Sequence, residues 1–261
     1  MSWPPLADMV GGRGRVRLER EGPLARMVFS NPGARNAMSL PMMADFLAAV
    51  AELIAHPPLA LILVGGGTDG FCAGGDLRDV RTHLMGDGSA EAMSSEMGRA
   101  TAQLAASPMV IVSAVEGAAL GGGAELSQLA DWVIMAESAK IGFVHARLGV
   151  SPGWGGASLL FRRVGRSAAT AILLRAEVHD AECALTLGLA DQVAADGEAL
   201  AQAEAWLAPI LTAPPEAIGG LLRLVREGAS SETAGSERDI FCSLWGGEAH
   251  RAALDRSGAG K

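Results

Sequence analysis

The fold of this chain is decided by residues 108–126, which read PMVIVSAVEGAALGGGAEL. An apolar run of strand length leads into three glycines, and an acidic residue, Glu125, follows at the predicted start of a helix. Glycine lets the backbone approach a ligand closely, and a helix that begins at such a loop presents free N–H groups and its positive end. This segment predicts an oxyanion site with a carboxylate beside it. The alternative is that the glycines only let a helix pack tightly on a strand.

A second segment of the same kind lies upstream. Residues 59–64 form an apolar, strand-like run, and GGGTDGFCAGGDL follows at residues 65–77. Two glycine-rich loops that follow two strands can converge on one ligand. The spacing of Gly65, Gly67 and Gly70 also fits a dinucleotide-binding fingerprint, but no helix opens directly after Gly70 and no acidic ribose ligand follows. We therefore favour an oxyanion site over a nucleotide-binding loop.

Four segments resemble, in the same order, the motifs of the crotonase superfamily, also called the enoyl-CoA hydratase/isomerase family. Residues 31–38 resemble its opening acyl-CoA segment, 71–77 and 119–125 its two oxyanion loops, and 141–156 its second catalytic segment. The resemblance covers nearly the whole chain. It implies an α/β fold of the ClpP/crotonase-like type, built of repeated ββα units with a C-terminal helical trimerisation region.

The resemblance also implies catalytic residues. The backbone amides of Gly75 and Gly122 would donate hydrogen bonds to the thioester oxygen of an acyl-CoA, and Glu125 takes the place of the family's first catalytic glutamate. Hydratases carry a second glutamate about twenty residues on, where this chain has His145. Water addition needs one group to activate the water and another to deliver the proton. The missing carboxylate therefore argues against an ordinary hydration.

The surroundings of His145 resemble one subgroup most closely. Residues 143–145 and 149–156 are similar to ethylmalonyl-CoA decarboxylases, which act on ethylmalonyl-CoA or methylmalonyl-CoA, and so are residues 213–218 and 245–247. Loss of carbon dioxide from such a thioester leaves an enolate, whose charge the two amides would stabilise. Histidine suits either protonation of the α-carbon or binding of the substrate carboxylate. The neighbouring glutamate would either repel that carboxylate or donate the proton itself.

Other interpretations of these residues stay open. Because one carboxylate suffices to move a double bond, an enoyl-CoA isomerase or hydratase that uses Glu125, with its acyl group on CoA or on a carrier protein, is the main alternative. A non-catalytic thioester-binding protein is a third. Glu125 could also serve only the helix dipole, and His145 could be a satisfied core residue.

Substrate contacts are expected near these loops, and CoA enters only as part of the substrate, without a separate cofactor. CoA is polyanionic, whereas the chain has a formal net charge of −8 and lysine only at positions 140 and 261, so arginine must supply the local cations. An aromatic side chain would form a wall of the acyl pocket. The residues predicted to bind substrate are Arg35, Ala73, Asp76, Leu77 and Trp154.

Composition narrows the class of protein. The acidic net charge argues against binding to nucleic acid, which is itself negatively charged. The three cysteines, at positions 72, 183 and 242, do not have the spacing of metal ligands, so we expect a reducing compartment and no metal site. A nucleophilic Cys72 is disfavoured because no histidine lies near it in sequence. The sequence contains no signal peptide and no membrane-spanning run, so we expect a cytoplasmic protein that does not bind membranes. The family resemblance implies a homotrimer or a dimer of trimers.

Apolar periodicity predicts the order of the elements. We expect a hairpin over residues 15–20 and 24–29, strands over 59–64 and 109–115, and helices over 41–55, 181–188, 198–211 and 215–226. Residues 81–95 are rich in Gly, Ser and Met, which predicts either a mobile lid over the acyl end or a plain surface loop. Residues 1–197 would form the core that carries the acyl-thioester site, and residues 198–261 the C-terminal helical region.

Overall fold

A computed structural model describes residues 13–84, 88–228, 239, 241–245, 247–248 and 251–252. Gly246, within the closing segment that the sequence analysis used, lies outside these residues. The chain forms two compact units, residues 1–207 and 208–261. The assignment of residues 1–197 to a catalytic core and 198–261 to a trimerisation region stays a prediction.

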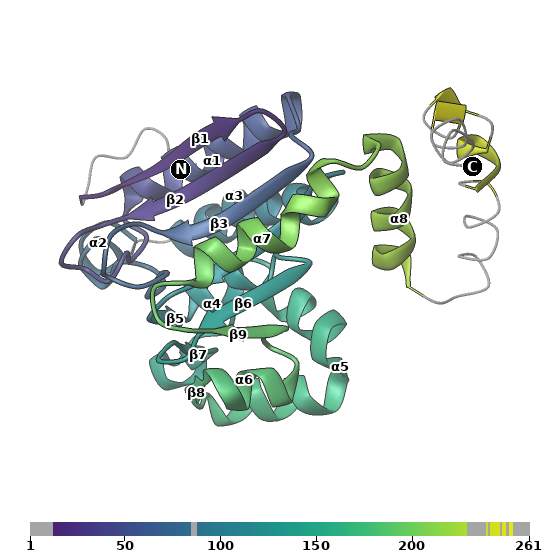
Figure 1. The fold of residues 1–261 in the computed structure, drawn as a ribbon. Coiled ribbons are helices and arrows are strands. Elements are labelled where there is room, and N and C mark those ends of the chain that lie inside the picture. Colours follow the sequence, from purple (N-terminus) through teal and green to yellow (C-terminus); the bar gives the residue numbers. More distant parts are fainter. Residues whose placement is uncertain are drawn as a thin grey trace. The chain divides into compact units, whose positions relative to one another are not determined.

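The first unit is built on a six-stranded sheet of order β1-β2-β3-β4-β6-β9 (Figure 1). Strands β1 and β2 form the predicted antiparallel hairpin, and all later neighbours pair in parallel. Parallel strands end at the same edge of a sheet, so the glycine-rich loops after β3 and β4 start at one edge. The strands are β1 Arg15–Glu21, β2 Leu24–Ser30, β3 Ala60–Gly65, β4 Val110–Val115, β6 Trp132–Ala136 and β9 Gln192–Ala194.

The core forms around β3 and β4, whose side chains are almost all buried on both faces, as expected of central parallel strands. Helix α1 (Leu40–Ala55) packs against β1, and α3 (Ser89–Ala105) packs against α1. The apolar stripe of α1, which includes Met42, Met43 and Phe46, is fully or almost fully buried. These contacts hold the segment between β2 and α1 in place.

A second, three-stranded sheet positions the site. It consists of β5 (Ala118–Leu120), β7 (Lys140–Gly142) and β8 (His179–Asp180), in that order. Strands β5 and β7 pair in parallel, with Leu120 opposite Gly142. The helices that follow them, α4 (Gly122–Ser127) and the 3-10 helix η2 (Val144–Leu148), therefore begin side by side.

The remaining helices include one correction. The expected loop over residues 81–95 is wrong, because α2 (Leu77–His83) and α3 occupy most of it, while residues 85–87 lie outside the described part. Helix α3 buries Met97, Ala100 and Leu104, whose helical spacing begins only after the segment that was expected to be a loop. The other helices are α5 Gly156–Arg175, α6 Ala181–Leu187, α7 Ala199–Leu211 and, in the second unit, α8 Pro215–Glu227; the last three confirm predicted helices.

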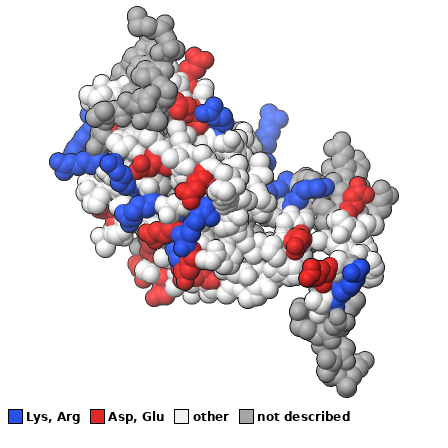
Figure 2. All heavy atoms as spheres, turned by 90° about the horizontal axis from the view of Figure 1, so that it is seen from above, with Lys and Arg blue, Asp and Glu red and all other residues white. Residues whose placement is uncertain are grey.

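Charged side chains of both signs are interspersed over the face drawn in Figure 2, consistent with 21 basic and 29 acidic residues. None of the helices in the described ranges has the length and apolar character needed to cross a bilayer.

Candidate active site

The two glycine-rich loops are joined by backbone pairing. The Cys72 N–H donates to the Ala118 carbonyl at 2.9 Å, and the Leu120 N–H donates to the Cys72 carbonyl at 3.0 Å. Close packing depends on glycine here, since a Cβ atom at Gly123 would lie 1.9 Å from the Cys72 carbonyl oxygen. The loop after β3 is therefore fixed against the start of α4.

Two backbone amides in these loops have no partner among the described residues. Met38 pairs with the flanking residues of Gly75, since its N–H donates to the Gly74 carbonyl at 2.7 Å and its carbonyl accepts from Asp76 at 2.9 Å. That pairing turns the Gly75 N–H away from Met38. Gly122 is the first residue of α4, where an N–H has no partner within the helix. A Cβ atom at Gly74 would lie 3.2 Å from the Gly122 nitrogen, so the loops that carry the two amides are in contact.

Glu125 is 2% exposed and accepts hydrogen bonds on both carboxylate oxygens. Oε2 accepts from the backbone N–H of Trp154 at 2.8 Å and of Gly156 at 2.9 Å, and Oε1 accepts from the Gly153 N–H at 3.3 Å. These amides belong to the loop that enters α5, so the positive end of that helix also favours an anion. N–H groups can only donate, and the surroundings of Glu125 therefore suit an ionised carboxylate.

His145 completes this cluster. Its Nε2 atom lies 3.0 Å from Oε1 of Glu125, and the residue is 8% exposed. Because the carboxylate is an acceptor, Nε2 carries a proton. The other ring nitrogen, Nδ1, is buried without a hydrogen-bond partner among the described residues. The structure thus brings the two predicted side chains within hydrogen-bond distance of each other.

Trp154 packs directly on the second oxyanion loop. A Cβ atom at Gly122 would lie 2.2 Å from Cζ3 of the indole, so the ring contacts the glycine that carries the free amide. Helix α3 anchors this loop, since the Ser94 hydroxyl donates to the Gly153 carbonyl at 2.8 Å and the Thr101 hydroxyl donates to the Trp154 carbonyl. Trp154 is 4% exposed, and its contact with an acyl group stays a prediction.

A profile of the family described as enoyl-CoA hydratase/isomerase matches residues 19–242. The chain belongs to this family. It is 36% identical to ethylmalonyl-CoA decarboxylase from Danio rerio, over 95% of this chain and 85% of that protein. It is 34% identical to ethylmalonyl-CoA decarboxylase from Mus musculus, over 92% and 76%. A crystal structure of an enoyl-CoA hydratase from Polaromonas sp. JS666 is similar with a TM-score of 0.83 and 28% identity, covering 93% of this chain and 98% of that one.

The comparisons confirm the predicted crotonase fold. Membership of the family also makes the chain a member of a class of enzymes that act on acyl-CoA thioesters. Proteins named decarboxylase and proteins named enoyl-CoA hydratase are both similar to it.

Four predicted substrate-binding residues lie around the first oxyanion loop of this enoyl-CoA hydratase/isomerase family member. Arg35 is exposed, and its carbonyl accepts from the Ala73 N–H at 3.0 Å. The Asp76 carboxylate caps α2 by accepting from the Arg78 N–H at 2.9 Å, and Leu77 is 49% exposed. The structure therefore gives Asp76 a structural role, and contacts of these side chains with substrate stay predictions.

Asn36, which the sequence did not mark as a site residue, fixes the segment that resembles the family's opening acyl-CoA motif. This fully buried side chain accepts from the Asn31 N–H at 2.8 Å and donates to the carbonyls of Gly70 at 2.6 Å and Gly66 at 3.1 Å. Its backbone has φ +51°, a conformation that asparagine tolerates better than most residues. The presence of asparagine, a residue type that tolerates positive φ, is the sequence signal that could have identified Asn36. Ser94 and Thr101 were also missed, and nothing local marks them.

Cys72 is excluded as a nucleophile. Burial raises the pKa of its thiol to about 12, since the thiolate charge would lose its hydration. The thiol is therefore protonated at neutral pH. In the described ranges, no three His, Cys, Asp or Glu side chains come together in a way that could hold a metal ion.

Proposed function

We propose that this enzyme decarboxylates a malonyl-type acyl thioester, with ethylmalonyl-CoA or methylmalonyl-CoA as the expected substrate. The observation that carries the proposal is the pairing of His145 with Glu125 at 3.0 Å, beside the unpartnered amides of Gly75 and Gly122. The relatives named ethylmalonyl-CoA decarboxylase, at 36% and 34% identity, support it.

In the proposed reaction, the bond between the α-carbon and the substrate carboxylate breaks. Its electron pair moves into an enolate, and carbon dioxide leaves. The charge collects on the thioester oxygen, where the Gly75 and Gly122 amides donate hydrogen bonds. Removing one such donor typically costs about 100-fold to 1,000-fold in kcat, so these amides supply much of the stabilisation.

His145 then delivers a proton to the α-carbon. Its Nδ1 is the ring nitrogen without a protein partner, and Nε2 stays bonded to Glu125. An ionised Glu125 stabilises the positive charge on the ring before the transfer and fixes the orientation of the imidazole. After the transfer, the ring regains a proton from solvent. Glu125 is thus a positioning residue, and His145 is the catalytic acid.

Enoyl-CoA isomerisation or hydration is the alternative, and the similarity to the Polaromonas enoyl-CoA hydratase favours it. Both reactions need a general base that can reach a substrate or water proton. In this chain each Glu125 oxygen already accepts two hydrogen bonds, three of them from backbone amides that cannot move aside separately. The carboxylate is therefore better suited to positioning His145 than to abstracting a proton.

The test is a product analysis with ethylmalonyl-, methylmalonyl- and crotonyl-CoA. We expect loss of carbon dioxide from the first two, and a fall of kcat by about 100-fold to 10,000-fold in His145→Gln. His56→Gln is the matched control, because His56 is exposed at the end of α1. Water addition or double-bond migration on crotonyl-CoA without decarboxylation would overturn the proposal.

A further inference from the structure

A histidine and a cysteine in the first unit form a pair that the proposed reaction does not use. His179 lies in β8, at the edge of the three-stranded sheet, and Cys183 follows four residues later in the first turn of α6 (Figure 1). Sγ of Cys183 lies 3.4 Å from Nδ1 of His179, which is within hydrogen-bond distance for sulfur. A thiol in contact with an imidazole is an arrangement in which cysteine can become nucleophilic.

Backbone elements hold both side chains of this pair. His179 lies opposite the fully buried Ile141 in the pairing of β8 with β7. The Asp180 carboxylate caps α6 by accepting from the Cys183 N–H at 2.9 Å, which fixes the first turn of the helix. The contact between the imidazole and the thiol is therefore set by the strand on one side and by the helix cap on the other.

The buried edge of the imidazole indicates where its proton lies. Nε2 of His179 is buried and has no hydrogen-bond partner among the described residues. A neutral imidazole carries one N–H group and one lone pair. A buried N–H group without an acceptor is costly and rare, so the proton is better placed on Nδ1, the nitrogen that has a partner. The Nδ1–H group then donates to Sγ of Cys183.

This hydrogen bond favours the ionised form of the sulfur. Hydrogen bonds are stronger when the acceptor carries a charge, and the thiolate is the form of cysteine that reacts. Cys183 is partly exposed, so its proton can pass to water and a small molecule can approach the sulfur. Cys72 differs in both respects, because it is buried and its pKa is raised to about 12 by the loss of hydration.

We propose that Cys183 is a modification site that reacts with low-molecular-weight disulfides, with His179 as the positioning residue that stabilises its thiolate. The thiolate attacks one sulfur of the disulfide, a new S–S bond to the protein forms, and the S–S bond of the reagent breaks. The leaving thiolate takes a proton from water. The product is a mixed disulfide that a thiol can reverse. This step requires no chemistry at Glu125 or His145, so the inference is independent of the proposed function.

The test is incubation of the full-length protein with oxidised glutathione at neutral pH. Peptide mass spectrometry measures the rate of adduct formation at each cysteine, and exposed Cys242 supplies a reference rate in the same sample. The variant His179→Leu removes the hydrogen-bond donor. The matched control is His179→Asn, whose side-chain amide can place an N–H group near the position of Nδ1.

We expect His179→Leu to slow the modification of Cys183 about threefold to tenfold relative to that of Cys242. The lost hydrogen bond lowers the fraction of thiolate, while the thiolate that remains is a stronger nucleophile and offsets part of the loss. His179→Asn should keep the wild-type rate. Wild type also supplies a test that needs no variant, because its Cys183 should react faster than its Cys242.

Three results would overturn the inference. A Cys183 in wild type that reacts more slowly than Cys242 shows that the sulfur is not activated. Equal rates at Cys183 in wild type and His179→Leu show that the imidazole does not stabilise the thiolate. Equal slowing in His179→Leu and His179→Asn shows that the shape of the strand controls the rate and the N–H donor does not.

Discussion

Replacement of Glu125 tests whether its carboxylate holds the catalytic loop. Glu125→Ala leaves the buried N–H groups of Trp154 and Gly156 without acceptors. Each unsatisfied buried donor costs about 1–3 kcal/mol, so the free energy of unfolding should fall by about 2–6 kcal/mol. Glu125→Gln keeps one oxygen for those two amides. Its NH2 group takes the place of Oε1, loses the bond from Gly153, and can donate to Nε2 of His145 when the imidazole proton moves to Nδ1, so the substitution should cost only about 1 kcal/mol.

The assay is urea unfolding of each variant, with the free energy taken by linear extrapolation to water. Glu116→Ala is the matched control, because the Glu116 carboxylate also accepts two backbone N–H groups, from Gly197 at 3.2 Å and Ala199 at 3.0 Å, but closer to the surface. Water can replace it there, and a loss below about 1 kcal/mol is expected. Equal losses in Glu125→Ala and Glu125→Gln, within about 0.5 kcal/mol, would show that the acceptor oxygen of residue 125 does not hold the loop.

Two further predictions concern the oxyanion loops. Gly122→Ala places a Cβ atom 2.2 Å from the Trp154 ring, so the amide must shift and we expect kcat to fall about 100-fold. The control is Gly98→Ala, whose Cβ atom would lie 3.9 Å from its nearest neighbour, and which should retain activity. Equal kcat values in the two variants would contradict the role of the Gly122 amide. Burial raises the pKa of the Cys72 thiol to about 12, so almost none of it is ionised below about pH 11. Iodoacetamide at pH 8 should therefore modify the exposed Cys242 but not Cys72 in the native protein. Peptide mass spectrometry after labelling checks this, and rapid modification of Cys72 would show that its loop opens.

Much of the site could be predicted from local sequence. Gly75 and Gly122 follow strands whose apolar runs mark them as buried, and parallel strands bring the following loops to one edge. The position of His145, 20 residues after Glu125, matches the register of β5 with β7, which fixes where the following helices start. These features depend on short segments and on general sheet geometry.

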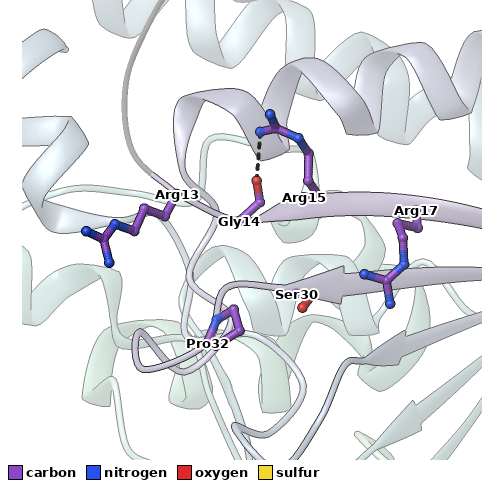
Figure 3. A pocket seen from close by; sticks show the side chains of 6 residues that line it. All are labelled: Arg13, Gly14, Arg15, Arg17, Ser30 and Pro32. Atoms are coloured by element: carbon purple, nitrogen blue, oxygen red, sulfur yellow. Dashed lines mark hydrogen bonds between the residues drawn. The ribbon is translucent and has the colours of Figure 1, made fainter.

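Other features of the site depend on contacts between distant segments. Ser94 bonds to a carbonyl 59 residues away and Thr101 to one 53 residues away, and no local pattern marks either side chain. The loop expected at residues 81–95 is wrong for a different reason. The buried apolar residues that mark helix α3, Met97, Ala100 and Leu104, all come after this segment, so its own composition did not indicate a helix. The pocket at the start of β1, whose lining includes Arg13, Arg17 and Ser30 (Figure 3), could not be predicted either, because its form depends on how closely Gly14 approaches Ser30.

The activity proposed for this crotonase-family enzyme is removal of a carboxylate, not hydration of a double bond. A competition assay distinguishes the two activities. Ethylmalonyl-CoA and crotonyl-CoA are supplied in one mixture, and mass spectrometry follows the release of carbon dioxide and the conversion of crotonyl-CoA together. We predict that kcat/KM for ethylmalonyl-CoA exceeds that for crotonyl-CoA by at least about 100-fold, and that His145→Gln abolishes the difference. Faster conversion of crotonyl-CoA, with the carboxylate of ethylmalonyl-CoA left intact, would show that the enzyme is a hydratase or isomerase and not a decarboxylase.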